Sequence, residues 1–538
     1  MTSQPHQLGS LQAKSWQSSF AANILVVVPL VAILCLMYSL SPPKGNSKFK
    51  GVPIVGPKWT ILARYRFFRN ARVYVEQGYK EFKHTFFKLS AQDILVVPNK
   101  FVDELRSLPE EQLSSIQNFE GLYSTTSILL EGHLHTQTIQ SKLTPSLAKL
   151  VPITERELEK ALASELPVDI ENGTDIAAFP LVLRLISHVA ACHFVGYPLC
   201  QDEEWLSTAL KYTENAFRTI ILIRIFPDWM KSTVSWFIPY AWKVSSALRR
   251  AQQIIVPLVV ERRRLEQSAL ENDRAYTKPP DFLQWMMDAA NSHDGEPHRL
   301  AHRLLILTLA AVHTTSMAAT QAFFDLCSRS EYIEPLREEV LQVLEEDKSF
   351  KKTTLTKLRK LDSFIRESQR LNPPSLLGFK RAVKQPLELS DGTVLPQGAH
   401  LMMPVYPIVI DETVTPNPMR FDGFRHYEKR LLPGEANKHQ FATTSNDNLH
   451  FGHGKYACPG RFFAANSVKL LLAKLLLDYE FDLADGGKRP ENVACHEYVF
   501  PNPDARVILR KRSAKNEGIA LGRHSNAQRH RPRSAFLN

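Results

Sequence analysis

Apolar residues recur at helical spacing through the middle of the chain, which predicts four amphipathic helices. They span residues 147–163, 178–194, 242–272 and 331–347. The longest apolar stretch, 304–326, also has helical length, but it contains polar residues such as His313 and Asp325. We therefore predict a buried core helix with a polar kink there rather than a second membrane span.

Short strands are predicted nearer the two ends of the chain, where β-branched and aromatic residues cluster between turn residues. The candidate strands span 87–97, 387–394, 401–405 and 506–509, and Asp391-Gly392 marks a turn. We therefore expect a mainly α fold with a minor β part.

Residues 20–40 form an apolar segment broken only by Asn23 and Ser39. Its length matches a bilayer's hydrocarbon core, so we predict a single transmembrane anchor. Lys44, Lys48 and Lys50 follow the segment, which places the rest of the chain in the cytoplasm and residues 1–19 on the opposite side. A cleaved signal peptide is the alternative, but the apolar segment is long for one.

The composition indicates a folded chain with a charged end. The 538 residues are 44% hydrophobic and carry a formal net charge of +11. Much of that charge lies in residues 511–538, which we expect to be a disordered basic tail. The tail lacks interleaved aromatic residues, so we predict no nucleic-acid partner. A Pro- and Gly-rich lead-in, 41–58, joins the anchor to a predicted catalytic domain spanning 59–510.

The six cysteines do not form a disulfide framework, and no CxxC pair predicts zinc. Cys458 differs from the others because it lies in the sequence FGHGKYACPG, ahead of an apolar helical run at 462–477. Glycines let the backbone fold tightly around the sulfur, and a helix N-terminus stabilises a thiolate. A structural cysteine in a turn is the alternative interpretation.

The segment resembles the haem-binding loop of the cytochrome P450 family, F-x-x-G-x-[HR]-x-C-x-G. Phe451, Gly454, Cys458 and Gly460 match this pattern. The resemblance implies haem b with Cys458 as the axial ligand of its iron. Tyr456 replaces the usual basic residue, and we expect it to offer a haem propionate a neutral hydrogen bond instead.

Other elements of the same family occur in the expected order. Glu367 and Arg370 form an E-x-x-R pair on one helix face, and Arg425 matches the third partner of the family's structural lock. Arg381 resembles the arginine that binds a haem propionate, with a surface charge as the alternative. His133 is a candidate for a similar contact, with a surface histidine as the alternative.

Residues 310–315 of this chain, AAVHTT, resemble the oxygen-binding motif of the family. Thr314 occupies the place of the threonine that manages protons, and its hydroxyl can bond back to a carbonyl one turn earlier. His313 replaces the usual acid. It either relays protons or hydrogen-bonds to a neighbouring helix. Without the other motifs, an ordinary core helix would be the preferred interpretation.

The resemblance implies a monooxygenase that takes electrons from NADPH through a separate reductase, with cytochrome b5 as a further partner. A basic surface with Lys455, Arg461 and Lys469 is expected to dock the reductase. Such enzymes are anchored in the endoplasmic reticulum membrane. The alternatives are a haem-thiolate isomerase or dehydratase that needs no external electrons, and a haem-based sensor or carrier.

The expected substrate is a hydrophobic secondary metabolite. The AAVHTT segment and the sequence DFLQW at 281–285 resemble fungal P450s that oxidise diterpenes, indole diterpenes and meroterpenoids. We therefore expect a terpenoid or meroterpenoid, with an alkaloid or polyketide intermediate as the alternative.

Overall fold

The computed structural model describes residues 51–56, 61–89, 94–115, 128–130, 132–167, 170–226 and 228–512. The anchor expected at 20–40 lies outside the described residues, as does the tail from residue 513 onward. Predictions about both segments therefore remain predictions.

Helices make up most of the described chain. The α-helices are α2 (Ile61–Phe82), α3 (Val102–Leu105), α5 (Leu134–Thr138), α6 (Thr144–Glu165), α7 (Ala178–Phe194), α8 (Glu203–Ile223), α9 (Asp228–Ser235), α10 (Pro239–Glu271), α11 (Phe282–Ala289), α12 (Pro297–Cys327), α13 (Ile333–Asp347), α14 (Lys352–Lys357), α15 (Arg359–Leu371), α16 (Tyr406–Val409), α17 (Arg425–Leu431) and α18 (Arg461–Asp478). Single turns of other helix types are η1 (Asn99–Phe101), η2 (Ile139–Leu143), η3 (Ile170–Asn172), η4 (Leu199–Gln201), η5 (Ser330–Tyr332) and η6 (Gly454–Tyr456).

The strands are short and form four sheets. They are β1 (Ile54–Val55), β2 (Phe87–Leu89), β3 (Ile94–Val96), β4 (Leu113–Ser114), β5 (Thr174–Ala177), β6 (Leu377–Val383), β7 (Leu387–Glu388), β8 (Val394–Leu395), β9 (His400–Pro404), β10 (Tyr479–Leu483), β11 (Val493–Cys495), β12 (Tyr498–Phe500) and β13 (Arg506–Lys511). The largest sheet has the order β1-β2-β3-β9-β6-β4. A second sheet has the order β10-β13-β5, and β11-β12 and β7-β8 are two-stranded.

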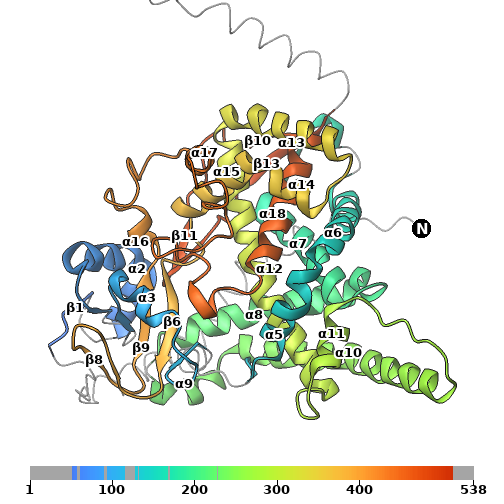
Figure 1. Ribbon diagram of the computed structural model, residues 1–538, viewed down its shortest axis with the longest axis horizontal. Coiled ribbons are helices and arrows are strands. Elements are labelled where there is room, and N and C mark those ends of the chain that lie inside the picture. The colour runs from blue at the N-terminus through green and yellow to red at the C-terminus, as the bar shows by residue number, and fades with distance from the viewer. Residues whose placement is uncertain are drawn as a thin grey trace, which may run out of the picture.

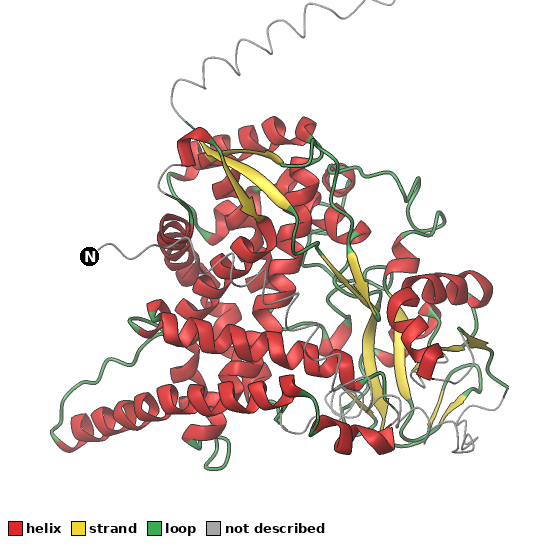
Figure 2. Ribbon diagram, turned by 180° about the vertical axis from the view of Figure 1, so that it is seen from behind, coloured by secondary structure: helices red, strands yellow, loops and turns green. Residues whose placement is uncertain are grey.

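Helix α12 passes through the middle of the molecule (Figure 1) and packs against α7, α8, α10, α15 and α18. The six-stranded sheet lies at one side of the molecule (Figure 2), and α10 lies toward the other side (Figure 1). Among the described helices, α12 alone is long and apolar enough to cross a membrane, but most of its apolar window is buried in the protein. The prediction of a core helix is therefore confirmed, and the helix runs without interruption through the expected polar kink.

Residues next to both predicted domain boundaries pair with the predicted catalytic domain. Ile54 and Val55, assigned to the lead-in, form β1 and pair in parallel with β2. Lys511, assigned to the tail, pairs with Tyr479 at the end of β13. Arg512 follows it, donating its backbone N–H to the Asp478 carbonyl at 2.9 Å. Each segment is retained because a neighbouring strand or helix end takes up its backbone hydrogen bonds.

Candidate haem-binding site

The loop that carries Cys458 folds back on itself before α18 begins. The Cys458 N–H donates to the Phe451 carbonyl at 2.7 Å, which closes the loop. The Phe451 ring packs edge-on against Phe441, with centroids 5.3 Å apart. The loop thus has a fixed shape that holds the cysteine at the N-terminal end of a long buried helix.

Gly454 attaches this loop to the rest of the protein. It has a φ of +76°, and a Cβ atom placed there would lie 2.5 Å from the Arg106 carbonyl oxygen. The next residue, Lys455, donates its N–H to the same carbonyl at 3.1 Å. Only glycine meets both requirements, a left-handed backbone and close approach to another backbone segment.

Opposing effects act on the Cys458 thiol. Burial raises its pKa, while the backbone N–H groups of Gly460 and Arg461 and the charge of Arg461 lower it. Gly460 precedes α18, and a Cβ at this glycine would meet no atom within 4 Å. The donors suit a thiolate, and a metal cation on the sulfur would supply the remaining stabilisation because it deprotonates a coordinating thiol.

Helix α12 leaves two small side chains uncovered by neighbouring elements within the described part of the chain. Ala310 and Thr314 are exposed although they lie mid-helix, whereas Val312 and Thr315 beside them are buried. The Thr314 hydroxyl donates to the Ala310 carbonyl at 2.7 Å, the bond predicted for a threonine in this place. The hydroxyl oxygen therefore faces open space while its proton is held by the helix.

His313 points to a neighbouring helix. Its Nε2 lies 2.8 Å from the Thr213 hydroxyl of α8, and its ring lies 6.2 Å from that of Phe217. Burial and, secondarily, the charge of Arg218 lower the His313 pKa to about 4. The imidazole is therefore neutral near pH 7, and the geometry favours the hydrogen-bonding alternative over a proton relay.

Arg381 carries a buried charge whose guanidinium is only partly hydrogen-bonded within the described part of the chain, although the charge of Glu110 acts on it. One nitrogen, Nη1, donates to the Lys380 carbonyl at 2.8 Å, while Nε and Nη2 have no hydrogen-bond partner. Burial lowers the pKa of this guanidinium to about 10, which leaves it charged. A buried cation normally has a counter-charge, so these two nitrogens indicate an anionic group that the protein binds. The alternative of a surface charge is wrong because Arg381 is only 4% exposed.

Tyr456 lies against this arginine. The Arg381 guanidinium carbon is 4.9 Å from the Tyr456 ring centroid, and the Tyr456 hydroxyl is buried without a well-formed hydrogen bond. Burial and the neighbouring Glu110 carboxylate raise the pKa of the phenol, so it remains a neutral donor. Arg381 and Tyr456 together fit the propionates of a haem held by Cys458.

The predicted structural lock forms around Glu367. Its carboxylate accepts two hydrogen bonds from Arg370, each 2.8 Å long. The Arg425 Nε lies 3.4 Å from the same carboxylate. Arg370 also donates to the carbonyls of Val409 and Pro418, so the cluster joins α15 to the end of α16 and to the segment that follows it.

His133 is half-buried and lies at the N-terminal end of α5, where its carbonyl accepts the Gln137 N–H at 2.9 Å. Its neighbour His135 has the closer link to the core, with Nδ1 lying 3.4 Å from an Arg303 nitrogen of α12. His133 thus lies near α12, and within the described ranges its side chain makes no hydrogen bond or ion pair.

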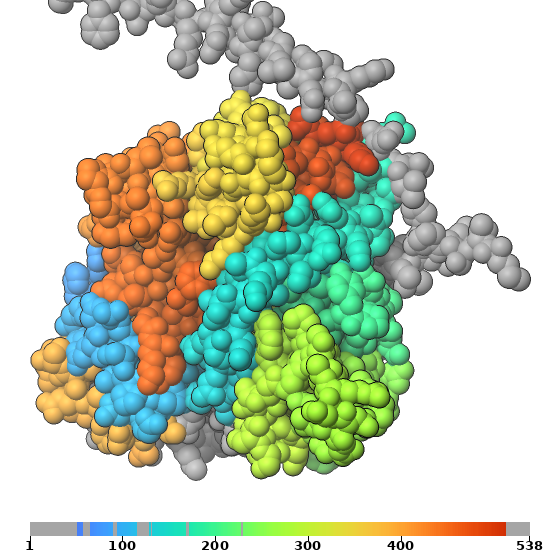
Figure 3. All heavy atoms as spheres, turned by 45° about the vertical axis from the view of Figure 1, so that its right-hand side comes forward, coloured from blue at the N-terminus to red at the C-terminus, as the bar shows by residue number. Residues whose placement is uncertain are grey.

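One docking prediction is wrong. Lys469 is buried, and its ammonium group pairs with Asp362 at 2.6 Å and donates to the Leu355 carbonyl. Lys455 is exposed as expected. Lys469 instead lines the floor of a groove of about 280 Å³ between α6, α14 and α18, which Lys352 and Phe462 also line. Figure 3 shows this side of the molecule, with α6 in blue-green and the α13–α14 region in yellow.

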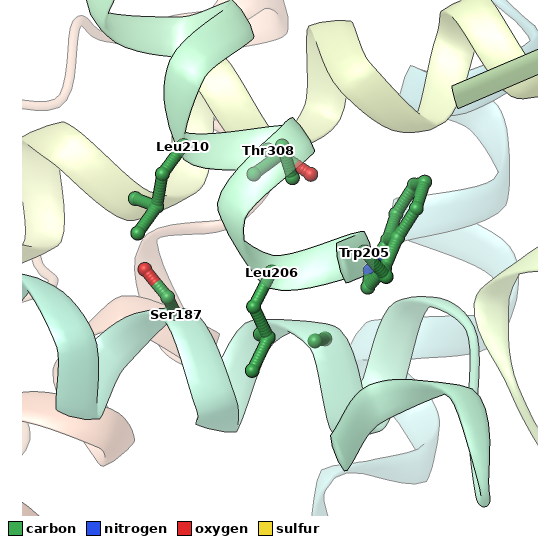
Figure 4. Close-up of a pocket in the computed structure, with 7 residues that line it drawn as sticks. Ser187, Trp205, Leu206, Leu210 and Thr308 are labelled. Carbon is green, nitrogen blue, oxygen red and sulfur yellow. The ribbon is translucent and has the colours of Figure 1, made fainter. Parts of the chain in front are cut away.

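A second, much smaller cavity lies between α7, α8 and α12 (Figure 4). Its volume is about 10 Å³, and Ser187, Leu206 and Thr308 are among its lining residues. Such a space holds one water molecule at most. It is therefore a packing gap and not a substrate site.

Sequence reasoning missed two residues that shape the site. The backbone carbonyl of Arg106 accepts a hydrogen bond from the cysteine loop, and the Thr213 hydroxyl forms a hydrogen bond with His313. No sequence signal marks Arg106, because any residue has a carbonyl. Thr213 lies on an amphipathic helix with a polar position turned inward, which is a weak signal for a buried partner.

Comparison with known proteins agrees with this geometry. The sequence model of the cytochrome P450 family matches residues 126–509. A cytochrome P450 monooxygenase of Emericella nidulans, AN1598, is 49% identical over 90% of this chain and 92% of its own length. The olcJ monooxygenase of Penicillium canescens is 45% identical over 93% and 96%, respectively. An ent-kaurene oxidase of Gibberella intermedia is 36% identical over 92% and 94%.

The chain therefore belongs to the cytochrome P450 family, and it is a monooxygenase whose curated relatives are fungal. Members of this family hold haem through a cysteine thiolate. The fold agrees as well: a cyanobacterial CYP120A1 with bound retinoic acid matches with a TM-score of 0.63. That match covers 86% of this chain and 99% of the other at 18% identity.

Proposed function

We propose that this enzyme holds haem b through Cys458 and inserts one oxygen atom from O2 into a C–H bond of a terpenoid-type secondary metabolite. The observation that carries the proposal is the pairing of a donor-rich cysteine loop with the orphaned guanidinium of Arg381. A haem has both a metal ion that the cysteine loop could bind and carboxylates that Arg381 could bind. When bound, haem supplies the activation of dioxygen.

The protein residues position this chemistry and move protons. Gly460 and Arg461 direct N–H groups at the sulfur and support its negative charge. The Thr314 hydroxyl donates its hydrogen bond to the Ala310 carbonyl. Rotation of the hydroxyl would point the same O–H group into the open space beside α12. Neutral His313 keeps α12 attached to α8 through Thr213.

An aromatic cluster supports a hydrophobic substrate. Phe217 of α8 contacts Tyr498 and Phe500 of the β12 strand, with ring centroids 5.3 and 5.6 Å away. The same phenylalanine contacts His313, one residue from Thr314. Apolar walls with few polar groups suit a terpenoid hydrocarbon. Relatives named ent-kaurene oxidase, which act on a diterpene, favour the same substrate class.

Isotope incorporation tests the proposed reaction. The full-length protein, combined with a fungal NADPH–cytochrome P450 reductase, is supplied with candidate diterpenes and meroterpenoids under 18O2. We expect one 18O atom per oxidised product and NADPH consumption that depends on substrate. A product that forms without NADPH and carries no 18O contradicts the proposal and indicates an isomerase or dehydratase.

Electrons in this proposal come from NADPH through that separate reductase, with cytochrome b5 as a second donor. The groove between α6, α14 and α18 has exposed Lys352 on its rim and an exposed Phe462. A cationic rim around an apolar patch suits a partner with an acidic surface. Lys352→Glu should lower the rate of haem reduction at low salt, and an unchanged rate would exclude this docking surface.

We further propose that residues 20–40 anchor the enzyme in the endoplasmic reticulum membrane, with the catalytic domain in the cytoplasm. The full-length protein should stay with microsomes after an alkaline carbonate wash. A chain that begins at Lys44 should be largely released. Equal retention of both would show that another surface binds the membrane.

A further inference from the structure

Three buried side chains with metal-ligating atoms meet at the junction of α6, α7 and η4. Glu157 comes from α6, Cys192 from α7 and Cys200 from η4. They are 1%, 5% and 0% exposed. Their ligand atoms all lie within 4.8 Å of one another, the one such group within the described ranges. Two sulfurs and a carboxylate oxygen thus share one small interior site.

Two polar side chains lie against the Glu157 carboxylate of this cluster. The Glu157 carboxylate accepts the Tyr197 hydroxyl, and His188 Nδ1 lies 3.8 Å from its other oxygen. The other ring nitrogen of His188, Nε2, lies 3.1 Å from the Glu165 carboxylate, so the imidazole lies between two acidic side chains.

The two thiols are linked to each other. A hydrogen bond joins the Cys192 and Cys200 side chains in the protein interior. Replacing both thiol protons by one divalent cation leaves the net charge of the site unchanged. The environment that accommodates the neutral thiols is therefore electrostatically suited to a metal dithiolate as well.

We propose that Glu157, Cys192 and Cys200 bind one Zn²⁺ ion, with the Tyr197 hydroxyl at the fourth position. Thiolate sulfur and carboxylate oxygen are ligands of tetrahedral zinc, and thiolates select zinc over hard cations. Tetrahedral Zn–S bonds of about 2.3 Å separate two sulfurs by about 3.8 Å, within the observed spread. His188 lies beside the Glu157 carboxylate, 3.8 Å away, in the place that outer partners of metal sites occupy.

The bound ion would join three elements, α6, α7 and η4. Helix η4 leads within two residues into α8, which carries Thr213 and Phe217. Linking η4 to α6 and α7 fixes where α8 begins. Binding two thiols releases two protons, and because the folded protein alone presents all three ligands together, zinc should raise the unfolding temperature.

Zinc binding to the intact, haem-loaded enzyme tests this proposal. Full-length protein is reduced, stripped of metal with a chelator and titrated with Zn²⁺ alone, and bound zinc is measured by mass spectrometry. We compare Cys192→Ser, Cys200→Ser and Glu157→Gln with Cys327→Ser, which alters a buried cysteine outside the cluster. The carbon monoxide spectrum of each variant reports whether its fold is retained.

We expect one zinc ion per chain in the wild type and in Cys327→Ser. Either variant of the cluster cysteines should bind at least about 100-fold more weakly, since even outer partners contribute 10–100-fold. If a serine variant loses haem, the nearly isosteric Glu157→Gln decides the question through its own weaker binding. Wild-type protein that binds no zinc at equimolar concentration, or equal binding by the wild type and Glu157→Gln, overturns the proposal.

Discussion

Replacing Glu367 by glutamine removes the one negative charge that Arg370 and Arg425 share. Glu367 is fully buried, and its carboxylate also accepts the Asp422 N–H at 3.0 Å. Burial by itself raises the pKa of this carboxyl, but the hydrogen bonds and charges of its partners, Arg370 first, bring it down from 4.5 to about 2. The folded state therefore strongly favours the ionised form.

The pKa gives the size of the effect. Each pKa unit corresponds to about 1.4 kcal/mol, so the ionised Glu367 stabilises the fold by about 3 kcal/mol at pH 7. Removing one partner of a buried ion pair costs about 3–5 kcal/mol, which agrees. Because the folded pKa is lowered, this stabilisation is present above about pH 4.5 and is lost as the pH falls toward 2.

Denaturant unfolding of the haem-loaded protein measures this cost. The matched control is Glu261→Gln, because Glu261 and Arg264 form an exposed pair with the same sequence spacing and the same 2.8 Å distance. Surface pairs contribute little, so this control should unfold like the wild type. We expect Glu367→Gln to lose about 3 kcal/mol and much of its haem. Equal midpoints for the two variants at pH 7 would refute the reasoning.

Three further variants test the site. Thr314→Ala should keep the carbon monoxide spectrum but divert NADPH-derived electrons to peroxide, lowering product formation by about 10²–10⁴-fold, whereas Thr308→Ala, which removes a similar bond to a carbonyl, should stay coupled. Gly454→Ala should lower haem content far more than Gly434→Ala, because both glycines have a φ of +76° but only Gly454 lies against Arg106; equal losses would show that backbone strain alone matters. His313→Ala should leave the pH profile of coupling between pH 5.5 and 7.5 unchanged, since the wild-type imidazole is already neutral there; loss of a step near pH 6.5 would restore the relay.

Much of the helical frame was predictable from the sequence. Helix α7 has the predicted bounds, and α6, α10 and α13 differ from prediction by a few residues at their ends. Each buries a continuous apolar face, and this produces a strong periodic signal. Helix α2 carries no comparable signal because charged residues interrupt its apolar positions, and it was missed.

Strand pairing was less predictable. Strand β6 was missed because it is stabilised by hydrogen bonds to β4 and β9 rather than by its own sequence pattern. Strand β4 lies more than two hundred residues away in sequence. The predicted 87–97 strand is instead two short strands, β2 and β3, that pair with each other. Pairing between distant segments depends on the whole fold, so local sequence specifies it poorly.

The residues of the site also differ in how far the sequence predicts them. The motifs identified Cys458, Thr314 and the Glu367 cluster because each depends on a fixed local spacing. The partner of His313 and the Glu157–Cys192–Cys200 cluster depend on contacts between helices. The two cysteines are eight positions apart, a spacing that matches no zinc motif, so only the packing of α7 against η4 brings them together.

The central claim is that Cys458 binds the haem iron, and the spectrum of the reduced protein with carbon monoxide tests it most directly. Full-length wild-type protein and the control Cys495→Ala, which alters another half-buried cysteine, should both show the red-shifted Soret band of a thiolate-ligated haem. Cys458→Ala should lack that band. If Cys458→Ala retains the wild-type spectrum, the thiolate comes from another residue and the account of the site is wrong.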